Sequence, residues 1–200
     1  SQPPRPQGRG MKPKPTPVQI FAEKNQLPIF TPINLNTQEE MSRFKNLKID
    51  LIIVMGYGKL IPKFYLNQNS LGCINIHVSL LPKWRGAAPI EYAILAGDRQ
   101  TGVTIFKLSE KIDAGPILNS KSCVIAESMT KIDLQKKLNK IGTKLLIKTL
   151  PMYLNNQLKL KEQDQYKISY AHKITSKNTQ INFFKSAKEI YNQVRAFSPK

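Results

Sequence analysis

The sequence contains little cysteine, histidine or tryptophan: its 200 residues include two Cys, two His and one Trp. Cys73 and Cys123 lack the close spacing of metal-binding cysteines, and two cysteines are too few for a disulfide framework. We therefore expect two reduced thiols and no metal site. Of the two histidines, His172 has no companion motif and is expected to be structural.

Long hydrophobic runs are also missing. The apolar run 51–55 is far too short to cross a bilayer, and no signal-type segment opens the chain. These absences predict a soluble, cytoplasmic protein with no membrane partner. A hydrophobic fraction of 40% still provides a core, which argues against wholesale disorder.

Acidic residues are scarce, with 13 Asp and Glu against 31 Lys and Arg, giving a formal net charge of +18. Such a surface attracts polyanions over long range. Only six of the basic residues are Arg, however, in a chain rich in Lys, Asn and Ile. An AT-rich genome produces the same bias, so charge alone leaves nucleic-acid binding undecided.

The order of polar and apolar segments indicates the fold class. Residues 1–17 are rich in Pro, Gly and basic side chains, which predicts a loop. Beyond them, segments with strand and helix periodicity alternate, which predicts an α/β fold with helices on both faces of the sheet. We expect helices at 18–24, 38–47, after Pro62, 88–96 and 131–154. We expect strands at 28–30, 50–55, 72–78, 101–107 and 115–125, of which 50–55 reads as a buried parallel strand.

Polar residues interrupt the apolar strand 72–78. Asn75 and His77 are two positions apart, so they point to the same face, and ligands of such sheets bind beyond the carboxyl ends of the strands. Asp113 follows in a loop between two strands. An amide, an imidazole and a carboxylate suit acyl or formyl transfer. The alternatives are a hydrogen-bonded core pair and a simple turn aspartate.

Several separated motifs together resemble the folate-dependent formyltransferase family. The resemblance covers the chain from Ser1 to Pro199. The motifs are Asn75-Ile-His77, Ser79-Leu-Leu-Pro82, Arg85-Gly-Ala-Ala-Pro-Ile90, Gly97-Asp98, Thr101-Gly-Val-Thr104 and Asp113-Ala-Gly115.

The resemblance implies a Rossmann-like formyltransferase sheet and an enzyme that uses 10-formyltetrahydrofolate as formyl donor, without a metal. It assigns Asn75, His77 and Asp113 as catalytic residues. It also assigns a set of folate-binding residues in two segments: Ser79, Leu80, Leu81, Pro82, Tyr57 and Gly58. Val78 departs from the family, which usually has a small residue there, and this side chain narrows the expected pocket beside His77.

The basic opening loop bears on the formyl acceptor. It resembles the loop with which one branch of the family binds the acceptor end of initiator methionyl-tRNA, a substrate for translation initiation. Arg9 is then the chief RNA contact, supported by Arg5, Lys12 and Lys14, since basic side chains on a Pro/Gly frame suit phosphates. Without the resemblance, a solvated linker would be the better interpretation. Acceptors of other branches, an amino-sugar nucleotide or a purine precursor, remain alternatives, as does a non-catalytic basic RNA-binding relative.

The resemblance also predicts the domain organisation. Residues 1–154 would form the catalytic domain, incomplete because family members begin with a strand and helix that precede the basic loop. Residues 155–200 would connect it to a C-terminal β-barrel domain beyond Lys200. We accordingly expect an internal fragment of a monomeric enzyme, with a sheet truncated at its N-terminal strand.

Overall fold

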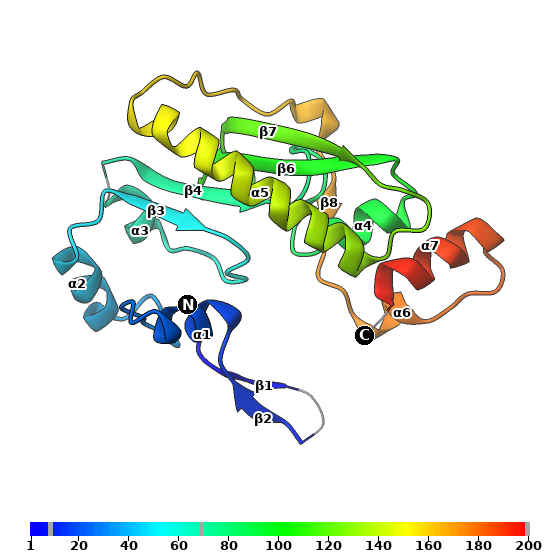
Figure 1. Ribbon diagram of the computed structural model, residues 1–200, viewed down its shortest axis with the longest axis horizontal. Helices are drawn as coiled ribbons and strands as arrows, with labels where there is room; N and C mark the ends of the chain where they lie inside the picture. The colour runs from blue at the N-terminus through cyan, green and yellow to red at the C-terminus, as the bar shows by residue number, and fades with distance from the viewer. Residues whose placement is uncertain (8–9, 69, 199–200) are drawn as a thin grey trace.

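The centre of the molecule is a four-stranded mixed sheet with the order β3-β4-β6-β7. A computed structural model describes residues 1–7, 10–68 and 70–198. Strands β3 and β4 are parallel, whereas β4–β6 and β6–β7 are antiparallel (Figure 1). The α/β prediction is therefore confirmed.

Two further pairs of short strands lie outside this sheet: β1 pairs with β2, and β5 pairs with β8. The strands are β1 (Arg5–Gln7), β2 (Lys12–Lys14), β3 (Leu51–Val54), β4 (Gly72–His77), β5 (Arg85–Gly86), β6 (Gln100–Lys107), β7 (Ile117–Val124) and β8 (Tyr170–Ala171). The helices are α1 (Pro17–Lys24), α2 (Gln38–Asn46), α3 (Lys63–Asn67), α4 (Pro89–Leu95), α5 (Lys131–Leu154), the 3₁₀ turn η1 (Gln165–Lys167), α6 (Ser176–Thr179) and α7 (Ala187–Phe197).

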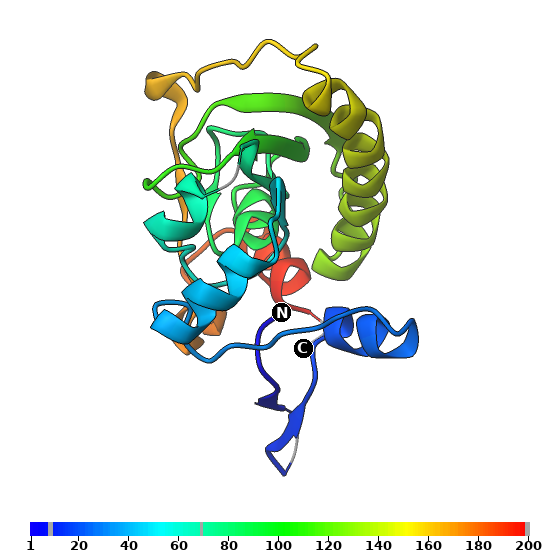
Figure 2. The ribbon, with the colours of Figure 1, turned by 90° about the vertical axis from the view of Figure 1, so that its left-hand side faces the viewer.

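Strand β4 presents different chemistry to the two faces of the sheet. Ile76 faces α5, since a Cβ added to Gly142 of that helix would lie 3.4 Å from the Ile76 side chain. Cys73 points the other way and donates to the Tyr65 carbonyl of α3 at 3.3 Å. Because strand side chains alternate, Asn75 and His77 share the face of Cys73. Figure 2 shows α3 and α5 on opposite sides of the sheet, so the predicted cover on both faces is confirmed.

Helix α5 covers the core face because its apolar residues recur at helical spacing. Leu134, Leu138, Gly142 and Leu145 are buried along one side. The helix begins with a capping box in which the Thr130 hydroxyl accepts from the Asp133 amide and the Asp133 side chain accepts from Thr130. Its bounds, Lys131–Leu154, are those expected from the sequence.

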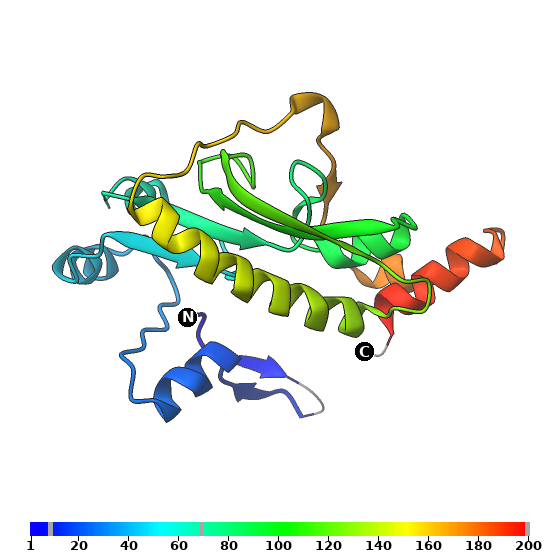
Figure 3. The same cartoon turned by 45° about the horizontal axis from the view of Figure 1, so that its top comes forward.

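The segment after α5 returns along the other side of the molecule. Strand β8 pairs in parallel with β5, with Arg85 opposite Tyr170 and Gly86 opposite Ala171. Helix α7 packs beside α4 (Figure 3), and its Ala196 is fully buried in the main core. This segment therefore shares the core of residues 1–154.

Three expectations need correction. Residues 5–7 and 12–14 form a short antiparallel hairpin instead of a loop; Pro6 and Pro13 face each other in it, where neither must donate to its partner. Residues 28–30 are not a strand, because no described strand lies beside them to pair with. Strand β3 is parallel as expected, but it is an edge strand and only half-buried, with Ile53 42% exposed.

Among the described residues, no helix is both long enough and apolar enough to cross a membrane.

The packing of α5 predicts a clear difference between two of its apolar residues. We expect Leu138→Ala to lower the free energy of unfolding by about 2–5 kcal/mol, because this fully buried side chain leaves a cavity. The control Ile147→Ala, on the exposed side of the helix, should change it by less than about 0.5 kcal/mol. Urea denaturation measures both values, and equal losses would contradict the assigned face.

Candidate active site

The site begins at the carboxyl end of β4, where the parallel pair β3–β4 ends. Val54, the last residue of β3, lies opposite Asn75, and His77 ends β4. The site therefore sits at the edge of the sheet where ligands of α/β proteins bind. Asn75 and His77 lie on the same face, as their spacing predicts.

His77 is nearly buried, with 6% of its surface exposed. Its Nε2 lies 2.8 Å from the carbonyl oxygen of Trp84. Because a carbonyl only accepts, this contact assigns the hydrogen to Nε2 and leaves Nδ1 as the nitrogen that gains or loses a proton. Nδ1 lies 3.7 Å from Oδ2 of Asp113, so the carboxylate faces this ring nitrogen.

Asp113 lies in the loop between β6 and β7 and adopts a left-handed conformation with φ of 46°. Its Oδ2 accepts a hydrogen bond from the Gly86 amide at 2.8 Å. Gly86 itself has φ of 116°, and a Cβ there would lie 2.6 Å from the Ala171 carbonyl oxygen, so only glycine fits. Two loops thus meet at the Asp113 carboxylate.

Asn75 carries an orphaned polar atom. Its side-chain Oδ1 is buried and has no hydrogen-bond partner within the described part of the chain. A buried amide oxygen without a partner is unfavourable, and this amide lines a cavity. By rotating about its last torsion, the amide presents either its oxygen or its NH₂ group to a molecule bound there.

The cavity beside these residues has a volume of about 520 Å³. Asn75, His77 and Asp113 all line it, together with Tyr57 and Gly58 from the loop after β3. The structure therefore brings five of the predicted site residues to one cavity.

The remaining predicted folate residues, 79–82, do not line the cavity. The Ser79 hydroxyl donates to the Lys83 carbonyl, and the Ser79 carbonyl accepts from the Thr104 hydroxyl at 2.7 Å. The Leu81 amide donates to the same Thr104 oxygen at 3.1 Å. Leu80 and Pro82 are half-buried within this turn. These hydrogen bonds fix the conformation of the chain between His77 and Trp84.

Val78 does line the cavity, next to His77. Its side chain is partly buried against the core. This is the wall of the pocket that Val78 is expected, from the sequence, to narrow.

The predicted RNA-binding residues fall on the β1–β2 hairpin, which extends away from the sheet (Figure 1). Arg5 and Lys14 lie opposite each other, and Arg5, Lys12 and Lys14 are exposed. Arg9 lies outside the described residues. The charge of the hairpin acts on one residue of the cavity wall: burial raises the pKa of Tyr57, and the Arg5 guanidinium acts in the opposite direction.

Two groups in the site were not predicted: the Trp84 carbonyl that holds His77 and the Gly86 amide that holds Asp113. Both belong to the backbone. Side-chain patterns carry no signal for backbone groups, although the unusual Arg85-Gly86 pair marks the position where one of them lies.

No group of three or more His, Cys, Asp or Glu side chains that could hold a metal ion occurs in residues 1–7, 10–68 and 70–198.

Comparison with known proteins shows the family of the chain. The family described as formyl transferase matches residues 1–150. The chain belongs to this family, and the family resemblance of its motifs is confirmed.

Curated relatives share the name methionyl-tRNA formyltransferase. The protein from Coxiella burnetii (strain CbuK_Q154) is 44% identical over 199 residues, covering 100% of this chain and 63% of its own length. The protein from Bartonella quintana is 46% identical over 200 residues, covering 100% of this chain and 65% of its own length. The chain thus spans a little under two thirds of these relatives.

Solved structures share the fold. A sugar 3N-formyl transferase crystallised with dTDP and 5-N-formyl-THF is 26% identical with a TM-score of 0.71, over 90% of this chain and 62% of that one. An N-formyltransferase from Helicobacter canadensis, solved with folinic acid and dTDP-3-aminofucose, is 24% identical with a TM-score of 0.73, over 96% and 66%.

The electrostatic effect of the hairpin on the cavity wall can be measured through Tyr57. We expect Arg5→Ala to raise the pKa of Tyr57 further, because a nearby positive charge that favours the phenolate is lost. Lys12→Ala, nearer the tip of the hairpin, should leave it unchanged. NMR titration of ring-labelled tyrosines, with Tyr57→Phe identifying the resonance, measures the pKa. Equal effects of the two substitutions would contradict this placement.

Proposed function

We propose that the protein transfers a formyl group from 10-formyltetrahydrofolate to the α-amine of methionyl-initiator-tRNA. The observation that carries the proposal is the convergence of Asn75, His77 and Asp113 on one cavity in a chain of the formyl transferase family. An amide, an imidazole and a carboxylate around one cavity are groups that suit acyl-type transfer.

The cavity suits a folate. Its walls combine apolar side chains such as Leu60, Ile61 and Ile112 with Asn75, whose side-chain Oδ1 has no partner in the described part of the chain, a composition typical of small-molecule sites. Tyr57 and Gly58 would hold the ligand from the β3 side. When bound, the folate supplies a formyl carbon open to attack by an amine.

Asn75 and His77 would act on the formyl oxygen. The Asn75 NH₂ group, turned into the cavity, donates to an oxygen that gains negative charge during attack. His77, protonated at Nδ1, adds positive charge on the same side of the cavity. Because its Nε2 is held by Trp84 at 2.8 Å, the ring keeps its orientation as the proton moves.

Asp113 would orient the His77 ring. Its carboxylate lies 3.7 Å from His77 Nδ1 and is itself fixed by the Gly86 amide. In the proposed reaction this carboxylate would keep the Nδ1 side of the ring turned toward Asp113, so that the imidazole stays oriented toward the cavity.

The acceptor is inferred from the relatives and the hairpin. The relatives at 44–46% identity bear the name of the tRNA enzyme, whereas the sugar formyltransferase noted above is 26% identical. Exposed Arg5, Lys12 and Lys14 would contact phosphates of the acceptor end, with Arg9 as chief contact on the basis of sequence. A non-catalytic RNA-binding relative would have no use for three convergent catalytic side chains.

The two histidines provide a matched test of the catalytic residues. We expect His77→Ala to lower kcat for formylation by about 10²–10⁴-fold, since general acid–base groups contribute on this scale. His172→Ala, on an exposed position of the 155–200 segment, should retain near wild-type kcat. Asp113→Asn should resemble His77→Ala. Near wild-type turnover of His77→Ala or of Asp113→Asn in a formylation assay would refute the assignment.

The hairpin charges predict a separate kinetic effect. We expect the double substitution Arg5→Ala/Lys14→Ala to raise the KM for tRNA several-fold and to leave folate binding unchanged. The increase in KM should be smaller at high salt, because salt screens phosphate contacts. Arg9→Ala should act the same way. Lys144→Ala, on the exposed side of α5, serves as the control for charge alone. An equal effect of the control would show that net charge, and not the hairpin, binds the RNA.

A further inference from the structure

Gln163 lies in the segment that follows α5, outside the family match to residues 1–150, yet it reaches the active site. Only 4% of its surface is exposed. Its side-chain Nε2 donates to the carbonyl oxygen of Asp113 at 2.9 Å and to that of Gly115 at 2.7 Å. One amide group therefore binds two backbone carbonyls of the turn 113–115.

Arg85 fixes the orientation of this amide. Its Nε and Nη2 both donate to Oε1 of Gln163, at 3.1 and 2.7 Å, and Arg85 is also 4% exposed. Because a guanidinium only donates, Gln163 must present its oxygen to Arg85 and its NH₂ group to the Asp113 turn. A buried charge needs such bonds, so the pair resists rotation.

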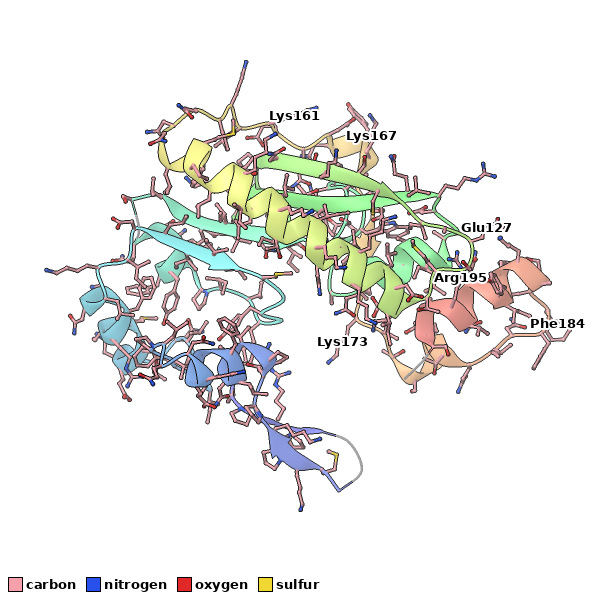
Figure 4. All side chains as sticks on the ribbon, in the orientation of Figure 1. Glu127, Lys161, Lys167, Lys173, Phe184 and Arg195 are labelled. Atoms are coloured by element: carbon pink, nitrogen blue, oxygen red, sulfur yellow. The ribbon has the colours of Figure 1, made fainter. Side chains whose placement is uncertain are left out.

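The backbone of the same segment supports the arrangement from both sides. Lys161, two residues before Gln163, exchanges two hydrogen bonds with Ile117, at 2.7 and 2.9 Å; Figure 4 shows Lys161 above β7. Farther along, the Ala171 carbonyl accepts from the Ala87 amide at 2.8 Å. The segment thus contacts both the Asp113 loop and the strand that carries the Gly86 amide.

The Asp113 turn needs this support. A left-handed backbone at a residue other than glycine is unfavourable by itself and persists only where its surroundings impose it. If the Asp113 carbonyl rotated, the backbone of the turn would change, and the carboxylate would move relative to the Gly86 amide.

We propose that Gln163, oriented by Arg85, is a positioning residue of the formyl-transfer site: it holds the Asp113 turn so that the carboxylate meets both Gly86 and His77. The inference rests on the proposed function for its kinetic consequence. Its structural consequence, the placement of Asp113, is measured without turnover.

The kinetic arm is a double-mutant cycle in the protein. We expect Gln163→Leu to lower kcat by up to about 100-fold with little change in the KM for tRNA, the scale of a small misplacement of a catalytic group. In the Asp113→Asn background, the same substitution should have little further effect, because Gln163 acts through Asp113. Gln157→Leu, on an exposed position of the same segment, is the control. Full additivity would overturn the proposal.

Gln163→Glu separates positioning from folding. It keeps an acceptor for Arg85 but removes both N–H donors and turns a carboxylate toward the carbonyl oxygens of Asp113 and Gly115. We expect a folded protein with kcat lowered as in Gln163→Leu. Wild-type kcat in this variant would overturn the proposal, since only the Arg85 contact would then matter.

The structural arm uses ¹⁵N-glycine labelling, which gives one signal for each of the ten glycines of the chain. We expect Gln163→Glu and Asp113→Asn to shift the Gly86 amide resonance in the same direction and to speed its hydrogen exchange, because both weaken the bond to the carboxylate. Gln157→Leu should not. An unmoved Gly86 signal refutes the positioning role, whereas absence of formyl transfer in the wild-type protein refutes the proposed function alone.

Discussion

The hydrogen bond from the Gly86 amide to the Asp113 carboxylate joins two loops that leave different strands of the sheet. On one side, the chain from β4 passes through Trp84, whose carbonyl holds His77, and reaches Gly86 two residues later. On the other, the β6–β7 loop turns at Asp113. This 2.8 Å contact therefore links the segment that holds the imidazole to the turn that carries the carboxylate.

Much of the fold could be predicted because its signals are local. The stripe of apolar residues and the capping box of α5 determine both its face and its bounds. Strand formation at 28–30 could not be predicted in this way, because a strand exists only where another strand pairs with it. The hairpin at 5–7 and 12–14 is the opposite case: its prolines argue against a strand in a sheet, but they are compatible with a pair in which they face each other.

The candidate site likewise contains residues that local patterns predict and residues that they do not. The alternation of strand side chains places Asn75 and His77 on one face, and motif order links them to Asp113. No local pattern distinguishes Gln163 from Gln157 and Gln165 in the same polar segment. Its importance arises from contacts with Asp113, Gly115 and Arg85, which lie 48 to 78 positions away in the chain. The turn 79–82 shows the reverse: its motif is conspicuous, yet its polar groups bond within the protein.

The pairing of β5 with β8 also constrains the order of folding. Gly86 lies opposite Ala171, so this contact closes a loop of 85 residues, a slow event compared with forming the hairpins and helices inside it. Because a chain is synthesised from its N-terminus, the sheet, α4 and α5 can assemble while residues 163–171 are still within the ribosome. The turn that carries Asp113 then gains its bonds from Gln163 only when that stretch docks, after the strands on either side of it have paired.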